Sequence, residues 1–105
     1  MSDDAPLAGT GVPAGAISKD LLIINKRGLH ARASAKFVQA VERFNAQVWV
    51  TRGGETVGGT SIMGLMMLAA GPGTTITVAA AGTDAEAALT AITELVESKF
   101  NEEGT

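Results

Sequence analysis

The most informative segment of the sequence surrounds its single histidine, His30, which follows Gly28 and precedes Arg32. Residues 31–44 have the apolar spacing of an amphipathic helix, so His30 is predicted at or beside the N-cap of that helix. The first N–H groups of a helix have no partners within it and, with the helix dipole, form a site for an anion. A histidine side chain titrates near pH ~6.5, so its neutral ring is a nucleophile at physiological pH.

This arrangement suggests one chemistry, a histidine that accepts a phosphoryl group. Gly28 lets the backbone turn sharply before the helix, because glycine tolerates positive φ. The planar guanidinium of Arg32 matches phosphate oxygens, and the charge of a new phosphate would fall on the free N–H groups. The alternative is a capping or solvent-facing histidine without chemistry, and composition and spacing alone do not separate the two.

Apolar patterning predicts four strands and three helices, because strands alternate or form short apolar runs and helices repeat every three to four residues. The predicted elements are a strand at 21–24, a helix at 31–44, strands at 47–51 and 55–57, a helix at 62–69, a strand at 74–80 and a helix at 83–100. Thr83 and Glu86 form a predicted capping box, and Phe100 ends the apolar stripe of the last helix. The order βαββαβα favours an α+β fold, one sheet with its helices on one face.

The length of 105 residues fits one small domain. Residues 1–16 show no periodicity and are predicted to be a flexible tail, with the folded domain at residues 17–105. The absence of cysteine excludes disulfides and Cys-ligated metals, and a single histidine excludes a multi-His metal site within one chain. The chain is therefore not expected to bind a metal.

Charge and hydropathy restrict the partners. No apolar run approaches ~20 residues, so no membrane insertion is expected, and residues 1–15 lack the features of a signal peptide, which favours the cytoplasm. The net charge of −3 argues against a nucleic-acid partner. Basic residues dominate around His30, at 26–43, and acidic residues dominate from 83 onward, so the basic end is expected to attract acidic partners.

Two segments together resemble a known family. The segment GLHAR at residues 28–32 resembles the active-site motif of HPr, the histidine-containing phosphocarrier of the bacterial phosphoenolpyruvate-dependent phosphotransferase system. The segment TSIMGLM at residues 60–66 resembles the regulatory-serine segment of that family, and its serine follows His30 by 31 positions, the family's separation. The resemblance runs from about Ile17 to Phe100. It implies the HPr-like open-faced β-sandwich, in which a four-stranded antiparallel sheet carries three helices on one face.

The resemblance implies a role for each matching residue. His30 would receive a phosphoryl group on Nδ1 from enzyme I, itself charged by phosphoenolpyruvate, and Arg32 would assist the transfer. The group would pass to a histidine of an enzyme IIA protein, and no metal or nucleotide cofactor would bind the carrier. Ser61 would be a regulatory site for an HPr kinase/phosphorylase, since a phosphate there adds about −1.5 to −2 charge beside a docking surface. The alternative for Ser61 is a plain helix N-cap.

A docking surface for these partners is predicted beside His30. The short helix at 62–69 carries two apolar stripes, and only one of them is needed for the core. Methionines on the other stripe suit a surface that accepts several partners in turn. The predicted docking residues are Arg27, Arg32, Ile62, Met63 and Met66. Plain core filling is the alternative for the second stripe, and the carrier is expected to be a monomer.

Three departures from the family pattern leave the pathway open. Ala33 replaces the usual proline, Thr60 stands where many relatives carry a base, and the tail is extra. These features resemble carriers of Gram-negative bacteria that serve a nitrogen-related regulatory relay. Two other classes stay open: a regulatory binding protein controlled at Ser61 without relay activity, and an α+β module that shares only the fold and binds nucleic acid. Whether the carrier itself counts as an enzyme is also open.

Overall fold

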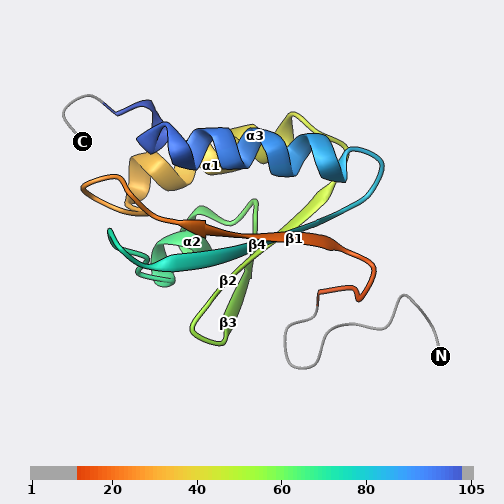
Figure 1. The fold of residues 1–105 in the computed structure, drawn as a ribbon, viewed down its shortest axis with the longest axis horizontal. Coiled ribbons are helices and arrows are strands. Elements are labelled where there is room, and N and C mark those ends of the chain that lie inside the picture. Colours follow the sequence, from red (N-terminus) through yellow and green to blue (C-terminus); the bar gives the residue numbers. More distant parts are fainter. Residues whose placement is uncertain (1–11, 103–105) are drawn as a thin grey trace.

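The computed structural model describes residues 12–102, which form a four-stranded sheet and three α-helices (Figure 1). The elements in chain order are β1 (Ile17–Leu22), α1 (Ala31–Glu42), β2 (Gln47–Arg52), β3 (Glu55–Gly58), α2 (Ile62–Met67), β4 (Thr75–Ala81) and α3 (Ala85–Glu97), followed by a short helical turn, η1 (Lys99–Asn101). Apart from η1, this is the predicted order βαββαβα.

Every strand pair in the sheet is antiparallel, and the strand order is β1-β4-β2-β3. β4 lies between β1 and β2, with Ile76 opposite Leu21 and Val78 opposite Val50. β2 and β3 form a hairpin whose turn contains two glycines at positive φ, the backbone that tight hairpin turns require. The first strand of the chain is therefore joined to the hairpin only through β4.

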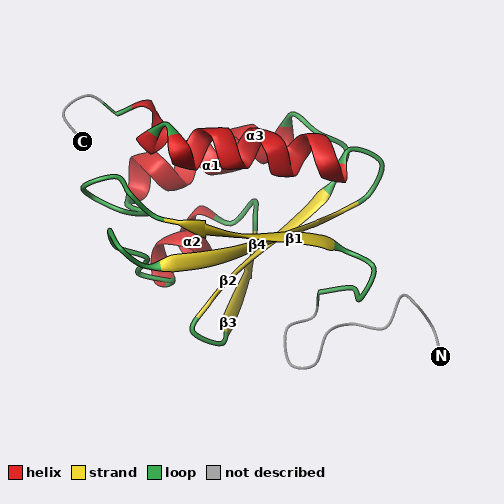
Figure 2. Ribbon diagram, viewed as in Figure 1, coloured by secondary structure: helices red, strands yellow, loops and turns green. Residues whose placement is uncertain are grey.

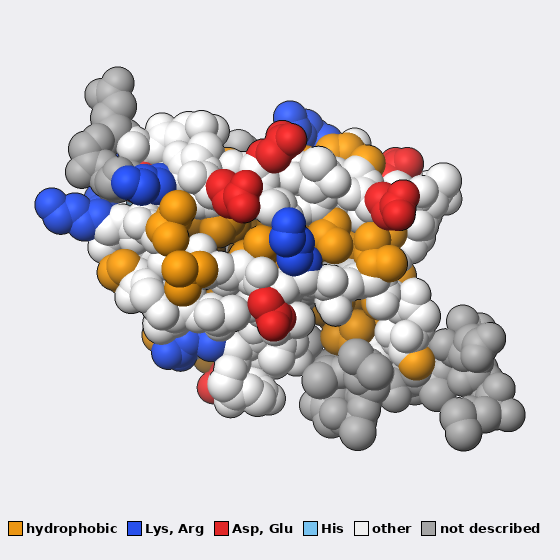
Figure 3. Space-filling view, viewed as in Figure 1, with side chains coloured by type: hydrophobic (Ala, Val, Ile, Leu, Met, Phe, Trp, Pro, Cys, Tyr) orange, Lys and Arg blue, Asp and Glu red, His pale blue; other side chains and the backbone are white. Residues whose placement is uncertain are grey.

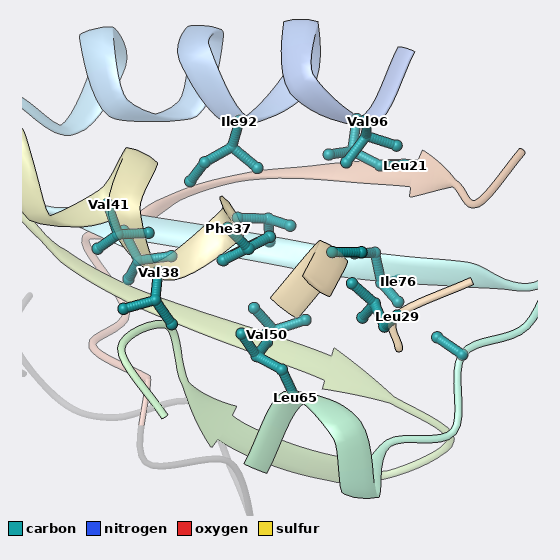
Figure 4. Close-up of a cluster of buried hydrophobic side chains, with 14 of the residues drawn as sticks. Leu21, Leu29, Phe37, Val38, Val41, Val50, Leu65, Ile76, Ile92 and Val96 are labelled. Atoms are coloured by element: carbon teal, nitrogen blue, oxygen red, sulfur yellow. The ribbon is translucent and has the colours of Figure 1, made fainter. Parts of the chain in front are cut away.

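The core lies between one face of the sheet and the helices. Ile76 and Val78 of β4 point to this face and are fully buried, as alternation along a half-buried strand requires. Figure 2 shows α1 and α3 side by side over the sheet. Figure 4 shows Phe37 of α1, Leu65 of α2 and Ile92 of α3 in one cluster with the strand residues. The fold class is thus the predicted α+β open-faced sandwich, with three helices on one face.

Several element boundaries differ from the sequence predictions; for example, β1 and α1 end at Leu22 and Glu42 rather than at 24 and 44. Three of the differences have a clear structural reason. β1 begins at Ile17 rather than at 21, because its pairing with β4 extends that far. α2 ends at Met67 rather than at 69, since Ala69 has a left-handed backbone with φ of 51°. α3 ends at Glu97, so Phe100 does not continue the helix stripe, although it is fully buried in η1.

The predicted capping box at the start of α3 is not formed. The N-cap is Asp84, one position after Thr83, and its side chain makes no cap hydrogen bond. Asp84 Oδ2 instead accepts a hydrogen bond from the backbone N–H of Asn45 at 2.8 Å. A tertiary contact to the loop between α1 and β2 therefore replaces the local cap that the spacing of Thr83 and Glu86 predicted.

The predicted tail, residues 1–16, lies mostly outside the described range, which begins at residue 12. Within that range Val12 is 3% exposed, so this residue packs on the domain. The division into a tail at 1–16 and a domain at 17–105 otherwise stays a prediction.

Candidate functional site

A tight loop between β1 and α1 sets the position of His30. Gly28 has a φ of 64°, and a side chain added there would stand 2.3 Å from the carbonyl oxygen of Ala70. The Leu29 N–H donates to this same oxygen at 3.0 Å, and the buried Leu29 side chain anchors the loop in the core. Asn25, fully buried, donates from Nδ2 to the Gly28 carbonyl at 2.9 Å. The positive φ predicted for Gly28 is confirmed, and the close approach of Ala70 adds a second reason for glycine.

His30 is the N-cap of α1, with an extended backbone at φ −75° and ψ −177°. Its Nδ1 accepts a hydrogen bond from the backbone N–H of Arg32 at 3.2 Å, and its carbonyl accepts from the N–H of Ser34 at 2.9 Å. Nδ1 therefore faces the first turn of α1, where free N–H groups and the helix dipole favour negative charge. The His30 side chain is 16% exposed. The structure places a ring nitrogen with a lone pair beside a helix N-terminus, as the sequence predicted.

A carboxylate from the far end of the described chain completes the site, and the sequence analysis missed it. The two carboxylate oxygens of Glu102 lie 2.9 and 3.0 Å from His30 Nε2. Oε1 of Glu102 also accepts a hydrogen bond from Asn25 Nδ2 at 3.1 Å. Asn25 thus links the loop before His30 to the carboxylate that contacts its ring.

The segment after α3 turns back toward His30 through η1. Its three non-glycine residues have φ of 58°, 58° and 54°, a backbone that costs roughly 1–2 kcal/mol per residue. Two contacts hold the segment in place: the fully buried ring of Phe100, and a hydrogen bond from the Lys36 ammonium to the Phe100 carbonyl. A large apolar residue just beyond a helix end is the one sequence signal for this return, but Phe100 also fits the apolar stripe of the helix and was predicted to belong to it.

Burial and neighbouring charges act in opposite directions on the Glu102 carboxyl. Its side chain is 7% exposed, and burial raises its pKa. The hydrogen bond and charge of His30, the Asn25 amide and the charge of Lys36 lower it by more, so the pKa of Glu102 lies below its ordinary value. Glu102 is therefore ionised at neutral pH. An ionised carboxylate can only accept hydrogen bonds, so its contact with His30 requires a proton on Nε2.

Basic side chains surround the ring. Arg27 and Arg32 are exposed, and within residues 12–102 neither forms an ion pair. A shallow hollow of about 200 Å³ beside the ring is lined by Arg27, Leu29, His30, Ala69, Ala70 and Gly71. Figure 3 shows acidic side chains over α3 and basic ones at the end of the molecule where the loop before α1 lies. The surface at His30 therefore carries the positive side of a charge separation.

The described part of the chain lacks a cluster for a metal ion and a helix that could span a membrane. It holds no group of three or more His, Cys, Asp and Glu side chains that could bind a metal ion. None of its helices is both long and apolar enough to cross a membrane. Within the described residues, His30 and Glu102 therefore have no third His, Cys, Asp or Glu side chain with which to form a metal site.

Ser61 is the N-cap of α2, and it is exposed. Its hydroxyl oxygen accepts a hydrogen bond from the Gly64 N–H at 2.9 Å, and its own N–H donates to Gly58. These bonds do not connect Ser61 to the His30 loop. A side chain at Gly64 would stand 2.8 Å from the Ser61 hydroxyl oxygen and 2.9 Å from Val57 Cβ, so glycine leaves room for the Ser61 cap and lets α2 pack closely on β3.

The other predicted docking residues lie on the outer side of α2. Ile62 and Met66 are each 40% exposed and Met63 is 70% exposed, whereas Leu65 is fully buried. Met67, which the sequence analysis did not single out, is 70% exposed. α2 packs against α1, and the residues that follow α2 line the hollow beside His30. The apolar side chains and the histidine thus occupy neighbouring parts of the surface.

Known proteins share this fold and sequence over most of the chain. Residues 17–98 match the family described as the PTS HPr component phosphorylation site. The chain is 49% identical over 86 residues to the phosphocarrier protein HPr of Neisseria meningitidis, covering 82% of this chain and 97% of that protein. It is 42% identical over 86 residues to the phosphocarrier protein NPr of Shewanella violacea, covering 82% and 94%. A crystal structure of HPr from Thermoanaerobacter tengcongensis superposes with a TM-score of 0.79 at 42% identity, covering 83% of this chain and 98% of that one.

Fold and sequence together are those of a phosphocarrier protein. The chain belongs to the HPr family of the phosphotransferase system. The resemblance identified at residues 28–32 and 60–66 is therefore confirmed, as is the predicted fold.

Proposed function

We propose that His30 is the residue that carries the phosphoryl group, on Nδ1. The observation that supports this most directly is the position of Nδ1, which faces the N–H of Arg32 at the N-terminus of α1. A phosphoryl group on Nδ1 would replace that hydrogen bond and lie against the free N–H groups of the first turn. The exposed Arg32 guanidinium is long enough to reach the same oxygens, where it would neutralise part of their charge.

The stabilisation offered to the phosphoryl group is modest, which suits a carrier. A helix N-terminus stabilises a nearby exposed charge by typically about 0.3–1 kcal/mol. Arg32 is solvent-exposed, so its contribution is screened by water and salt. A tighter phosphate site would retain the group, whereas a carrier has to return it to the next protein.

The donor in this proposal is enzyme I, charged by phosphoenolpyruvate, and the acceptor is a histidine on an enzyme IIA protein. Both would dock on the surface formed by Arg27, Arg32, Ile62, Met63 and Met66. Three of these side chains are apolar and at least 40% exposed, and burying them on a partner is favourable. The two arginines beside them favour a partner with an acidic rim, whose approach they would accelerate.

Ser61 is the proposed regulatory site, modified by an HPr kinase/phosphorylase. Its hydroxyl is exposed at the N-cap of α2, directly before Ile62 and Met63. A phosphate of about −1.5 to −2 charges there would repel an acidic partner rim while leaving His30 itself unchanged. The second candidate function is a regulatory binding protein whose partners are selected by Ser61 phosphorylation, without phosphoryl relay.

The setting of this activity is part of the proposal. The carrier acts in the cytoplasm as a monomer, because its donor and acceptor must each reach the same small surface in turn. It binds neither nucleic acid nor a metal. The relay serves either sugar uptake or the nitrogen-related regulatory branch. Ala33, Thr60 and the similarity to an NPr protein favour the second.

The experiment is intact-mass measurement after incubation with phosphoenolpyruvate, magnesium and purified enzyme I. The expected result is a single acid-labile phosphoryl adduct on the wild-type chain and on Ser61→Ala, and none on His30→Ala. Arg32→Ala is expected to load more slowly without losing the site. Retained loading of His30→Ala would contradict the role given to His30.

A second reaction separates the two candidate functions. ATP and an HPr kinase replace phosphoenolpyruvate and enzyme I, and the same three variants are compared. If enzyme I produces no adduct while the kinase labels Ser61, the regulatory binding protein is correct and the relay is not.

A further inference from the structure

Glu102 is held against the reactive ring by the turn that follows α3. The chain passes through three consecutive left-handed residues to reach His30, and Lys36 and the buried Phe100 ring hold it there. Such a backbone persists only where its surroundings enforce it. The carboxylate that arrives contacts Nε2 of His30 with both oxygens.

The hydrogen bonds of the two ring nitrogens of His30 require opposite protonation states. Nδ1 accepts a hydrogen bond from the Arg32 N–H, so it must carry a lone pair. Nε2 faces an ionised carboxylate, which can only accept, so it must carry the proton. Both contacts select the same neutral tautomer, and in that tautomer the nucleophilic lone pair points at the helix N-terminus.

We infer that Glu102 is a positioning residue for phosphoryl transfer at His30. It fixes the ring orientation and the tautomer, and Asn25 fixes Glu102 in turn through its Nδ2 hydrogen bond at 3.1 Å. This inference rests on the proposed function, because it gives Glu102 a part in a reaction at Nδ1. Glu102 itself does not touch the phosphoryl group, which lies on the other side of the ring.

The transfer step balances without a proton leaving the reacting nitrogen. The lone pair of Nδ1 forms the N–P bond, while the bond from phosphorus to the donor breaks and its electron pair leaves with the donor. The ring keeps its Nε2 proton and gains a positive charge, which lies opposite the Glu102 carboxylate and is stabilised by it. In the onward step phosphorus bonds to the acceptor nitrogen while the N–P bond breaks, and its electron pair returns to Nδ1. The ring departs as a neutral imidazole that keeps its Nε2 proton, hydrogen-bonded to Glu102.

The first test is nuclear magnetic resonance of the ¹⁵N-labelled His30 ring in wild-type protein, Glu102→Ala, Glu102→Gln and Glu97→Gln. Glu97 is exposed on α3 and forms no hydrogen bond or ion pair with His30, so its substitution removes the same charge without touching the contact and is the matched control. The Nε2–H proton is expected to be protected from exchange in the wild type and in Glu97→Gln. It is expected to be lost to exchange in Glu102→Ala, while the backbone amide spectrum keeps the pattern of the folded domain.

The second test is the rate of loading by phosphoenolpyruvate and enzyme I in the same variants. Glu102→Ala removes a charge-assisted hydrogen bond, so loading is expected to slow by about ten- to a hundredfold. Glu102→Gln keeps an acceptor without the charge and is expected to fall between Glu102→Ala and the wild type. Glu97→Gln is expected to load normally.

The outcomes separate this inference from the proposed function. Normal loading of Glu102→Ala overturns the role of Glu102, whether the ring proton is lost or retained. The contact would then only hold the segment after α3 in place. An unchanged ring proton in Glu102→Ala overturns the contact itself. Failure of the wild type to load overturns the proposed function instead, and the ring spectrum still reports on the contact between Glu102 and His30.

Discussion

Replacing Gly28 with alanine tests whether the loop before His30 is as tightly placed as its geometry indicates. Gly28 has a φ of 64°, and an added Cβ would stand 2.3 Å from the Ala70 oxygen and 2.8 Å from Gly71 Cα. Both neighbours are backbone atoms, so no side chain can rotate to make room. The loop or the segment at 70–71 has to move, and the hydrogen bond from Leu29 to Ala70 then lengthens.

The expected loss has two parts. A left-handed alanine costs roughly 1–2 kcal/mol more than glycine. Forcing a methyl group into a filled space costs typically about 1–3 kcal/mol, which includes the shift of the surrounding backbone. Gly28→Ala is therefore expected to lower the free energy of unfolding by about 2–5 kcal/mol. The domain should remain folded in the absence of denaturant, because domains of this kind have about 5–15 kcal/mol of stability.

Gly53→Ala is the matched control, since Gly53 has a φ of 58° but no atom within 4 Å of an added Cβ. It carries the conformational cost alone, so urea denaturation should show a loss of about 1–2 kcal/mol. Gly28→Ala should in addition slow the loading of His30, whereas Gly53→Ala should not. Equal loss of stability in the two variants would refute the reasoning, because the close approach of Ala70 would then have no energetic effect.

Three further predictions concern the core, the second helix and the carboxylate. Leu65→Ala should lower the free energy of unfolding in urea by about 2–5 kcal/mol, because Leu65 is fully buried; a smaller loss would mean that α2 can collapse onto the cavity. Ser61→Ala should cost about 0.5–2 kcal/mol through the lost N-cap bond to Gly64, and Ser61→Asn should recover most of it in the same denaturation assay. The lowered pKa of Glu102 contributes stability above the carboxyl's ordinary value of 4.5, and this contribution is lost as the pH falls through the lower folded value. The advantage of wild type over Glu102→Gln in urea should therefore be present at pH 7 and shrink below pH 4.5; a constant difference at all pH values would show that the carboxyl titrates normally.

The elements that build the core were predictable because their apolar spacing is regular. Phe37 and Val41 follow a helical period, and Val48 and Val50 alternate with Trp49, so each set has only one arrangement that buries it. The N-cap position of His30 was predictable for a similar reason. The amphipathic period begins directly after His30, and the structure has α1 begin at Ala31.

The partner of His30 was not predictable from local patterns. Glu102 meets the ring only because the chain leaves the helical path at Phe100 and turns inward. Phe100 also fits the 3.6-residue period of the preceding helix, so the periodic pattern gives no sign of the turn. The predicted capping box of α3 was wrong because the Asp84 carboxylate accepts a hydrogen bond from the Asn45 N–H instead of capping its own helix. In both cases a contact between distant segments outweighed a local preference, and such contacts leave no periodic trace.

A chain leaving the ribosome exposes His30 long before Glu102 exists. The two residues are 72 positions apart, and at about 5–20 residues per second the interval lasts roughly 4–14 seconds. β1 stays unpaired for almost as long, because the one strand that it pairs with is β4, which carries Ile76 opposite Leu21. Translation that stops before β4 therefore yields a histidine that has neither the strand that pairs with β1 nor its carboxylate, and the contact with His30 forms only once residue 102 has been added.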